Sequence, residues 1–539
     1  MFAKFKNALI SAVGGDEHDE FGSQKQKKNF RYEYSRPFFL KFSEEEINAV
    51  SDIRVRPLIL PRDVEFPFKS GYCECINAGK SKQNEDQGAF WRRTITPKWW
   101  TKKQGAEKPA DNIATEMAFE DGLQKSEDEE LRPKPRDPSL TYTVFAIFDG
   151  HGGPMVAVIA SKEMEGILHE KLSSVSDFLI PDPEGDIESD MQFQKGGFKY
   201  QLEVTKPVNQ SRLIVGALES SFREMDKRIG EDKENFKVKG GCTALLVLFI
   251  LGKVYTACAG DSRAIVVVDN QIEPLSRDHT PNSERMRICH LGHQYPFLLS
   301  DEYTSNEFHK RPTISDLGKN VLCRSPDGCG YLYRPANLDD LKMPLISGMG
   351  KRARLMGTIG VTRGFGDHEL KALRSSLAIK PFLSHVPEIR ILDVMQLRTT
   401  NSDVIIMGSD GLFDVTSNKE AVDVVRNFLE EADKISDDRK YLCAAQDLVN
   451  YARGKPTPNG SWKKKNGEPA SGDDITAWVI PIKPYQNEHY QWVSNMLAKE
   501  VNIQCSEYDK LPILTAEECL IGDGEEGSLI DNNIFFFKE

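Results

Sequence analysis

The chain has 539 residues, enough for one large domain with insertions or for two domains. Hydrophobic residues make up 39% of it and charged residues 28%, a composition typical of globular proteins with polar loops. No run of about 18 apolar residues predicts a transmembrane helix, the N-terminus lacks a secretory signal pattern, and the net charge of −12 argues against general nucleic-acid binding. Ten scattered cysteines indicate no disulfide framework, which favours a reducing compartment, the cytoplasm or the nucleus.

Residues 1–15 predict an amphipathic helix without acidic residues. The apolar side chains that recur along one face, at spacings of three, four and seven, are Phe2, Phe5, Leu9, Ala12 and Val13. Such a helix can lie in a membrane interface, which predicts peripheral contact with an intracellular membrane. A frayed terminus and a helix docked on the body are the alternatives. Residues 16–69 are predicted to form an N-terminal extension.

Apolar runs predict strands, and 3.6-residue periodicity predicts helices. The expected strands are 144–148, 242–250, 253–260, 264–268, 403–408 and 475–480, and the expected helices are 210–230 and two within 418–453, broken near 436–438. The short links between the second, third and fourth strands predict an antiparallel meander, followed by a turn at 269–271. Mixed strands and helices of this kind favour a layered α+β body.

Polar stretches rich in glycine, proline and charge interrupt this body. Solvated loops are predicted at 91–140, 181–209 and 454–472. Residues 484–539 form a C-terminal extension that contains an amphipathic segment and ends in IFFFKE. It is predicted either to pack on the body or to bind a partner.

Four aspartates stand at the ends of apolar strands. Asp149 and Asp410 follow two of them, Asp473 precedes a third, and Asp261 lies in the turn after a fourth. Strand ends can converge at one edge of a sheet system, where several carboxylates would suit Mg²⁺ or Mn²⁺. Each aspartate alone is better explained as a turn residue, so the prediction of a metal site depends on the repetition.

Seven ordered sequence blocks lie between about residues 70 and 483. They are NED at 84–86, FDGHGG at 148–153, GGCTALL at 240–246, AGDSRA at 259–264, GTIGVTRGFGD at 357–367, GSDGLFD at 408–414 and SGDDIT at 471–476. With these blocks the chain resembles the metal-dependent protein serine/threonine phosphatases of the 2C type, the PPM family. INAGKSKQNEDQ at 76–87 and the RPLIL stretch before it resemble the protein phosphatase 1H-like branch of that family.

The resemblance implies an α+β fold for residues 70–483: two antiparallel β-sheets packed as a sandwich, with helices on both outer faces and a binuclear metal site at one edge. It implies two Mg²⁺ or Mn²⁺ ions and a weaker third. The residues implied as ligands are Asp149, which bridges two ions, Gly150 through its carbonyl, Asp410 and Asp473 at the second ion, Glu85 and Asp86 beside the pair, with Glu85 acting through bound water, and Asp261 with Asp410 and Asp414 at the third ion.

The resemblance also implies hydrolysis of phosphoserine and phosphothreonine in phosphoprotein substrates, by attack of water held between the ions. His151, two residues past Asp149, would donate a proton to the leaving oxygen. Many relatives have a phosphate-binding arginine at the position of Ser81, which Lys80 and Lys82 flank here. Lys80 is assigned that role because the similar branch carries lysine there, although lysine lacks the bidentate fork of arginine.

A long flap is predicted at 287–356, with basic residues near 351–354. Long insertions beside an active site usually have a function, so a role in substrate selection is predicted, and the alternative is a tolerated surface loop. The alternative function is a catalytically weak or inactive family member that acts as a binding scaffold. The presence of Asp149, Asp410 and Asp473 argues against it. The sequence leaves the oligomeric state open.

Overall fold

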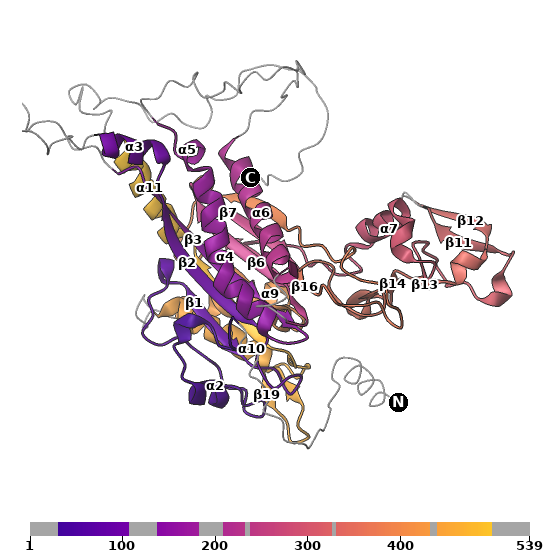
Figure 1. Ribbon diagram of the computed structural model, residues 1–539. Coiled ribbons are helices and arrows are strands. Elements are labelled where there is room, and N and C mark those ends of the chain that lie inside the picture. The colour runs from indigo at the N-terminus through magenta and orange to yellow at the C-terminus, as the bar shows by residue number, and fades with distance from the viewer. Residues whose placement is uncertain are drawn as a thin grey trace, which may run out of the picture.

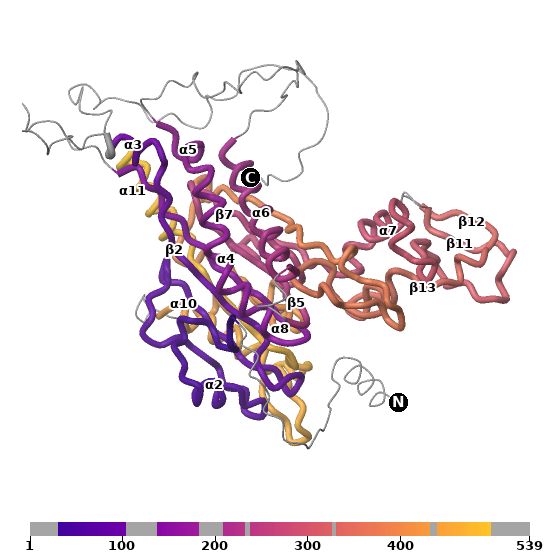
Figure 2. Tube along the Cα trace, viewed as in Figure 1, coloured from indigo at the N-terminus to yellow at the C-terminus, as the bar shows by residue number. Residues whose placement is uncertain are grey.

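The structure is a computed structural model that describes residues 31–106, 137–182, 209–231, 238–325, 330–431 and 439–497. It has the predicted α+β class, with two five-stranded sheets at its centre (Figures 1 and 2). The predicted helix at 1–15 and nearly all of the predicted loop at 181–209 lie outside the described residues. Within the described part of the chain, no helix has the length and apolar composition that crossing a membrane requires.

The first sheet contains the most apolar strands of the chain. In spatial order its strands are β17 (Glu388–Asp393), β7 (Lys253–Ala259), β6 (Ala244–Ile250), β3 (Leu140–Phe148) and β2 (Gln87–Ile95). All neighbours in it are antiparallel. Every residue of β6 is buried, because this strand lies in the middle of the sheet and both of its faces are covered.

The second sheet corrects the predicted meander. Its strands, in spatial order, are β1 (Gly71–Cys75), β21 (Ile475–Pro481), β18 (Val404–Gly408), β8 (Arg263–Val268) and β9 (Gln271–Pro274). β6 and β7 pair as predicted, but β8 leaves them and pairs with β18, after a turn in which Gly260 has a φ of +137°. The turn predicted at 269–271 is present at Asp269 and Asn270, both at positive φ, whereas Gln271 already begins β9.

The two sheets share an apolar cluster. Phe145 and Val247 of the first sheet lie in it together with Val266, Met407 and Trp478 of the second, and each of these side chains is at most 1% exposed. The alternate residues of the same strands face outward and pack against helices. Because successive residues of a strand point to opposite faces, the two sheets enclose a central apolar layer, and each sheet carries a second apolar layer on its outer face.

Two pairs of helices fill the outer layers (Figure 1). α4 (Met155–Ser174) and α6 (Gln210–Glu231) pack on the first sheet, and α9 (Asn418–Glu431) and α10 (Lys440–Arg453) pack on the second. The helices predicted at 210–230 and within 418–453 are thereby confirmed. The predicted break lies within residues 432–438, which fall outside the described part of the chain.

The predicted solvated loop at 91–140 is wrong in its first part. β2 continues to Ile95, and α3 (Lys98–Ala106) follows it. Trp91 and Trp100 are only 4% and 7% exposed, and the Trp99 indole N–H donates to the Ile180 carbonyl over 2.7 Å. The lysines in this stretch suggested a solvated segment, but the tryptophans between them bury enough apolar surface to order it. Residues 107–136 lie outside the described part.

The predicted flap projects from the body as a structured unit with its own small apolar cluster (Figures 1 and 2). Its α-helix and strands are α7 (Arg285–Gln294), β10 (Tyr303–Thr304), β11 (Asn320–Arg324), β12 (Tyr331–Pro335), β13 (Met343–Pro344), β14 (Ile346–Ser347) and β15 (Arg354–Leu355).

The remaining α-helices and strands of the described residues are α2 (Glu44–Val50), β4 (Gly150–His151), α5 (Ser176–Leu179), β5 (Gly241–Cys242), β16 (Phe365–Gly366), α8 (Asp410–Phe413) and α11 (Lys483–Leu497). The predicted loop at 454–472 contains a short hairpin of β19 (Lys455–Pro456) and β20 (Trp462–Lys463).

Candidate metal centre

Three carboxylates meet where strands of both sheets end. Asp149 comes directly after β3, Asp261 lies between β7 and β8, and Asp410 is the first residue of α8, just after β18. One carboxylate oxygen from each lies within 4.8 Å of the other two. The structure therefore brings together residues that are far apart in the sequence, at the edge where the sequence predicted a cation site.

Close backbone contacts hold this edge together. The Gly150 amide donates to the Glu85 carbonyl over 3.2 Å, and a Cβ at Gly150 would lie 2.5 Å from that oxygen. A Cβ at Gly411 would lie 1.8 Å from the Asp474 carbonyl. The glycine after each of the two aspartates is thus required because another loop passes directly against it.

Burial and neighbouring carboxylates raise the pKa of all three aspartates. Burial, and next the charge of Asp410, raises the pKa of Asp149 and of Asp261. Burial and the nearby Asp473 carboxylate raise the pKa of Asp410 to about 7. Like charges this close disfavour full ionisation unless positive charge is supplied between them. Carboxylate oxygens are the ligands that Mg²⁺ and Mn²⁺ prefer, so Asp149, Asp261 and Asp410 fit a hard divalent cation.

Asp86 provides a second sign that the site is built for a cation. Its side chain is 1% exposed, and its Oδ2 atom has no hydrogen-bond partner within the described part of the chain. Burial, and next the charge of Asp474, raises the pKa of Asp86. The same two effects raise the pKa of Glu85 to about 7. A buried carboxylate oxygen without a partner is costly, and a cation or its bound water would satisfy it.

Asp473 lies beside this group and forms an ion pair with Lys80. Burial alone would lower the pKa of Lys80, but the Asp473 carboxylate more than offsets that effect and raises it. The ammonium group is also within the field of Asp410 and Asp149. Lys80, predicted to bind phosphate, therefore lies at the rim of the acidic cluster, held by a predicted metal ligand.

His151 lies on β4, one residue past Gly150, and its Nε2 atom is 2.6 Å from Oδ2 of Asp367. His151 and Gly366 both pair with Gly241 in a small three-stranded sheet, which brings Asp367 next to the imidazole. A Cβ at Gly241 would lie 2.3 Å from the Asp367 carboxylate, so glycine is needed there. Burial would lower the pKa of His151, but Asp367 raises it above its usual value, which favours the protonated imidazolium.

Asp414 connects the centre to the flap. Its side chain is 57% exposed, and Lys351 of the flap lies 3.0 Å from its carboxylate and donates to its carbonyl over 2.6 Å. Its charge raises the pKa of Asp261 and Asp410, so it lies near both. Asp414, Asp473, Glu85 and Asp86 are therefore neighbours of the three-carboxylate group and are not members of it.

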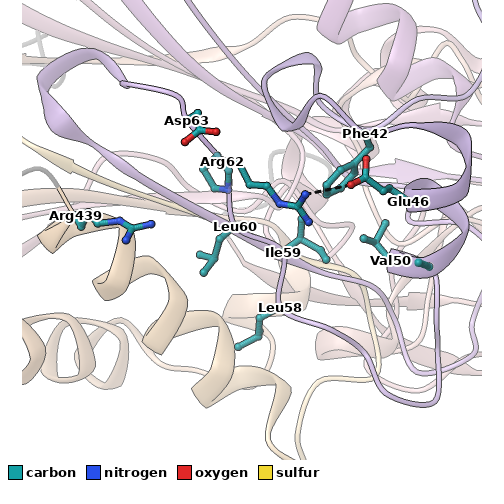
Figure 3. Close-up of a pocket in the computed structure, with 11 residues that line it drawn as sticks. Phe42, Glu46, Val50, Leu58, Ile59, Leu60, Arg62, Asp63 and Arg439 are labelled. Carbon is teal, nitrogen blue, oxygen red and sulfur yellow. Dashed lines mark hydrogen bonds and ion pairs between the residues drawn. The ribbon is translucent and has the colours of Figure 1, made fainter.

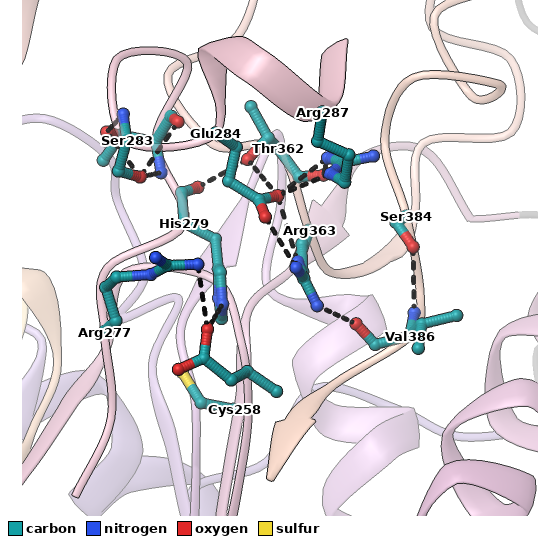
Figure 4. Close-up of polar contacts among 12 residues, drawn as sticks. Cys258, Arg277, His279, Ser283, Glu284, Arg287, Thr362, Arg363, Ser384 and Val386 are labelled. Carbon is teal, nitrogen blue, oxygen red and sulfur yellow. Dashed lines mark hydrogen bonds and ion pairs between the residues drawn. The ribbon is translucent and has the colours of Figure 1, made fainter. Parts of the chain in front are cut away.

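The start of the flap is fixed to the body by a buried polar cluster (Figure 4). The Arg363 guanidinium donates to both oxygens of Glu284 over 2.6 and 3.0 Å, and Thr362 Oγ1 donates to Glu284 Oε2 over 3.0 Å. Burial would raise the pKa of Glu284, but Arg363 and Arg287 lower it to about 2. Charge-assisted contacts of this kind hold the chain that enters the flap against the chain that leaves it.

Comparisons with known proteins agree with this geometry. The model of the protein phosphatase 2C family matches residues 115–297 and 345–457. The chain belongs to the protein phosphatase 2C family. It is a metal-dependent protein serine/threonine phosphatase, a hydrolase that acts on phosphoproteins, and the chain is similar to the 1H branch of the family.

Its relatives match nearly end to end. The chain is 36% identical to protein phosphatase 1H of Xenopus tropicalis over 90% of its own length and 99% of the frog protein, and 36% identical to the Homo sapiens protein over 89% and 97%. It is 37% identical to protein phosphatase 1J of Homo sapiens over 84% and 86%. A solved serine-threonine phosphatase 2C from Toxoplasma gondii is 17% identical, with a TM-score of 0.39, over 79% of this chain and 98% of that protein. That overlap is too weak to support an argument about the phosphatase.

The family match covers only part of the centre. It includes Asp149, Asp261, Asp410 and Asp414, and it leaves out the flap residues 298–344. The residues of the centre outside it are Lys80, Glu85, Asp86, Asp473 and Asp474. These residues are placed at the centre by their contacts and not by the family match.

Two residues of the centre were missed by the sequence reasoning. Asp474 accepts hydrogen bonds from the Asn77 amide over 2.7 Å and from the Glu85 amide over 3.0 Å, and so joins two loops. Asp367 contacts His151. Both residues stand in the blocks SGDDIT and GFGD, so the signal was present. Asp473 and Asp474 are neighbours in SGDDIT, however, and which of them faces the site depends on the direction of the strand that follows.

Proposed function

We propose that the phosphatase uses two Mg²⁺ or Mn²⁺ ions, with a weaker third, at the edge of a β-sandwich. The observation that carries the proposal is the group of Asp149, Asp261 and Asp410, three carboxylates with raised pKa values and adjoining oxygens. The residues that would hold the ions are Asp149 and the Gly150 carbonyl at the pair, Asp410 and Asp473 at the second ion, Glu85 and Asp86 beside them, and Asp261 with Asp410 and Asp414 at the third. When bound, the ions supply positive charge for the dianionic phosphate and lower the pKa of a bound water.

The side chains around the ions orient the phosphoester and move one proton. Lys80 would bind a phosphate oxygen, since its ammonium lies at the rim of the acidic cluster beside Asp473. His151, held as imidazolium by Asp367, donates its proton to the serine or threonine oxygen as the ester bond breaks. That donation matters because an alkoxide is a poor leaving group.

A phosphopeptide assay tests this proposal. The purified full-length chain is expected to hydrolyse a phosphoserine peptide with Mn²⁺ or Mg²⁺ and to lose that activity in EDTA. Lys80→Met should raise KM for the peptide more than it lowers kcat, and Lys82→Met is the control. Full activity in EDTA would contradict the metal mechanism. Absence of turnover with either ion would favour the inactive scaffold.

We propose that the flap selects phosphoprotein substrates, since Lys351 ties it to Asp414 at the rim of the centre. The Asn306 side-chain amide donates to the Asp340 carboxylate over 3.1 Å, so the two residues are neighbours and the intervening residues 307–339 can be replaced by a short Gly-Ser linker. The excised variant is expected to hydrolyse a small aryl phosphate at the parent rate but to dephosphorylate a different set of proteins. Quantitative phosphoproteomics of a treated lysate measures this. An identical set of substrates would mean that the flap tip is a tolerated loop.

We propose that residues 1–15 give peripheral contact with intracellular membranes, because their sequence combines an apolar stripe with lysines and no acid. The full-length chain is expected to float with anionic vesicles, and a chain lacking residues 1–15 should not. Flotation of both chains, or of neither, would remove the membrane role. It would leave the phosphatase assignment unchanged.

A further inference from the structure

Two buried arginines of the N-terminal extension reach loops of the metal centre. Arg36 lies well before β1 in the sequence and was expected in a peripheral extension. Its side chain is nevertheless 1% exposed and lies against the loop that carries Glu85 and Asp86. Its Nη1 atom donates to the Asn84 carbonyl over 3.1 Å and to the Asp86 carbonyl over 2.8 Å. Glu74 of β1 balances its charge, with a hydrogen bond from Nε of 2.8 Å and an ion-pair distance of 2.7 Å to Nη2.

Arg56 makes similar contacts with backbone carbonyls of the centre. It is fully buried and donates to the carbonyls of Ile76, Ser471 and Asp473 over 2.7, 2.7 and 2.9 Å. Its guanidinium lies over the Trp462 ring, 5.1 Å from the ring centre. The structure shows these carbonyls, rather than a salt-bridged carboxylate, as its partners. Desolvating a guanidinium is costly, and the three backbone acceptors of two loops compensate for it.

Both guanidinium groups donate hydrogen bonds to backbone carbonyls in loops of the metal centre. Arg36 donates to carbonyls of the loop that carries Glu85 and Asp86, and Arg56 donates to the Ile76 carbonyl and to two carbonyls of the loop that carries Asp473. A loop that is held at two of its carbonyls has a fixed backbone, and this fixes the position of the Cα atom that carries the carboxylate. Groups behind the direct ligands commonly set the affinity of a metal site in this way.

We propose that Arg36 and Arg56 are positioning residues of the metal centre, so that residues 31–56 belong to the catalytic unit rather than to an appendage. This inference depends on the proposed metal site. Arg36 orients Asp86 and Glu85 through the backbone, and Arg56 orients Asp473, the residue that Lys80 also contacts. Neither arginine touches the substrate or the reacting atoms.

The test is Mn²⁺ binding to the full-length chain by isothermal titration calorimetry. Lysine keeps the charge at each position, but one ammonium cannot span carbonyls that a guanidinium fork reaches. Arg36→Lys and Arg56→Lys are each expected to bind Mn²⁺ about tenfold more weakly than the parent. The control is Arg62→Lys on the same extension, a side chain 72% exposed that pairs with Glu46 over 3.1 Å and should leave Mn²⁺ binding unchanged (Figure 3).

A stability control separates positioning from general support. Phe39→Leu removes part of a ring that is 1% exposed in the same extension and packs on the rings of Phe66, Tyr72 and Trp478, so it should lower the melting temperature without weakening Mn²⁺ binding. Should Arg56→Lys fail to fold, Trp462→Leu loosens Arg56 while keeping its charge and should weaken binding in the same direction. Parent-like Mn²⁺ affinity in the arginine variants, or an equal loss in Phe39→Leu, would overturn the inference. A parent chain that binds no Mn²⁺ would instead overturn the proposed metal site itself.

Discussion

Asp149→Asn is expected to abolish phosphopeptide hydrolysis and to weaken Mn²⁺ binding by about 100-fold or more. Groups that only support a metal ligand typically cost about 10- to 100-fold in affinity or activity when replaced, and Asp149 is proposed to contact the ions directly. The amide keeps the shape of the side chain, so the variant removes one charge and little packing. Calorimetry gives the affinity and a phosphopeptide assay gives kcat/KM.

Asp149→Asn should have a melting temperature equal to or above that of the parent in EDTA, and below that of the parent in saturating Mn²⁺. Burial and Asp410 raise the pKa of Asp149 in the folded chain, so its ionised form destabilises that state at neutral pH, and removing the charge should keep or raise the melting temperature in EDTA. Saturating Mn²⁺ should stabilise the parent much more than the variant, since only the folded site binds it well.

Asp269→Asn is the matched control for that experiment. It makes the same chemical change at the β8–β9 turn, where φ is +48° and asparagine is well tolerated. Parent-like activity in Asp149→Asn, or Mn²⁺ stabilisation equal to that of the parent, would remove Asp149 from the site.

Local sequence patterns predicted the strands and helices of the body well, because the buried positions of each element follow from the spacing of apolar residues within a short stretch of sequence. The run at β6 is apolar at every position, and α9 and α10 repeat apolar residues at helical spacing. The sheet to which a strand belongs was not predictable in this way. β8 is as apolar as β7, and its departure to the second sheet depends on pairing with β18, more than 130 residues away in the chain.

The site shows the same division between local and distant information. The sequence blocks marked Asp149, Asp261 and Asp410, and the structure brings these three together. The contacts of Asp367 with His151, and of Arg56 with the Asp473 loop, join residues more than 200 positions apart. Nothing in the local composition around Arg56 distinguishes it from a solvated arginine, so only the fold reveals that it is buried.

His151→Ala is expected to lower kcat for a phosphoserine peptide by about 100-fold or more, the usual loss when a general acid is removed. An aryl phosphate should be affected much less, because a phenolate leaves without needing a proton. Both substrates should keep their dependence on Mn²⁺, since His151 is not among the three clustered carboxylates. Steady-state kinetics on the two substrates measures the difference.

Asp367→Asn extends that prediction to the residue that holds the imidazole. Asp367 lies 2.6 Å from Nε2 of His151 and raises its pKa, so the amide should leave the imidazole less protonated and less firmly oriented. We expect the same substrate selectivity as in His151→Ala, with a smaller loss on the phosphoserine peptide and little further loss when both substitutions are combined. A merely structural role of Asp367 would slow both substrates equally, and the losses would then add in the double variant. Equal losses on the two substrates in His151→Ala itself would show that another group, such as a bound water, protonates the leaving oxygen.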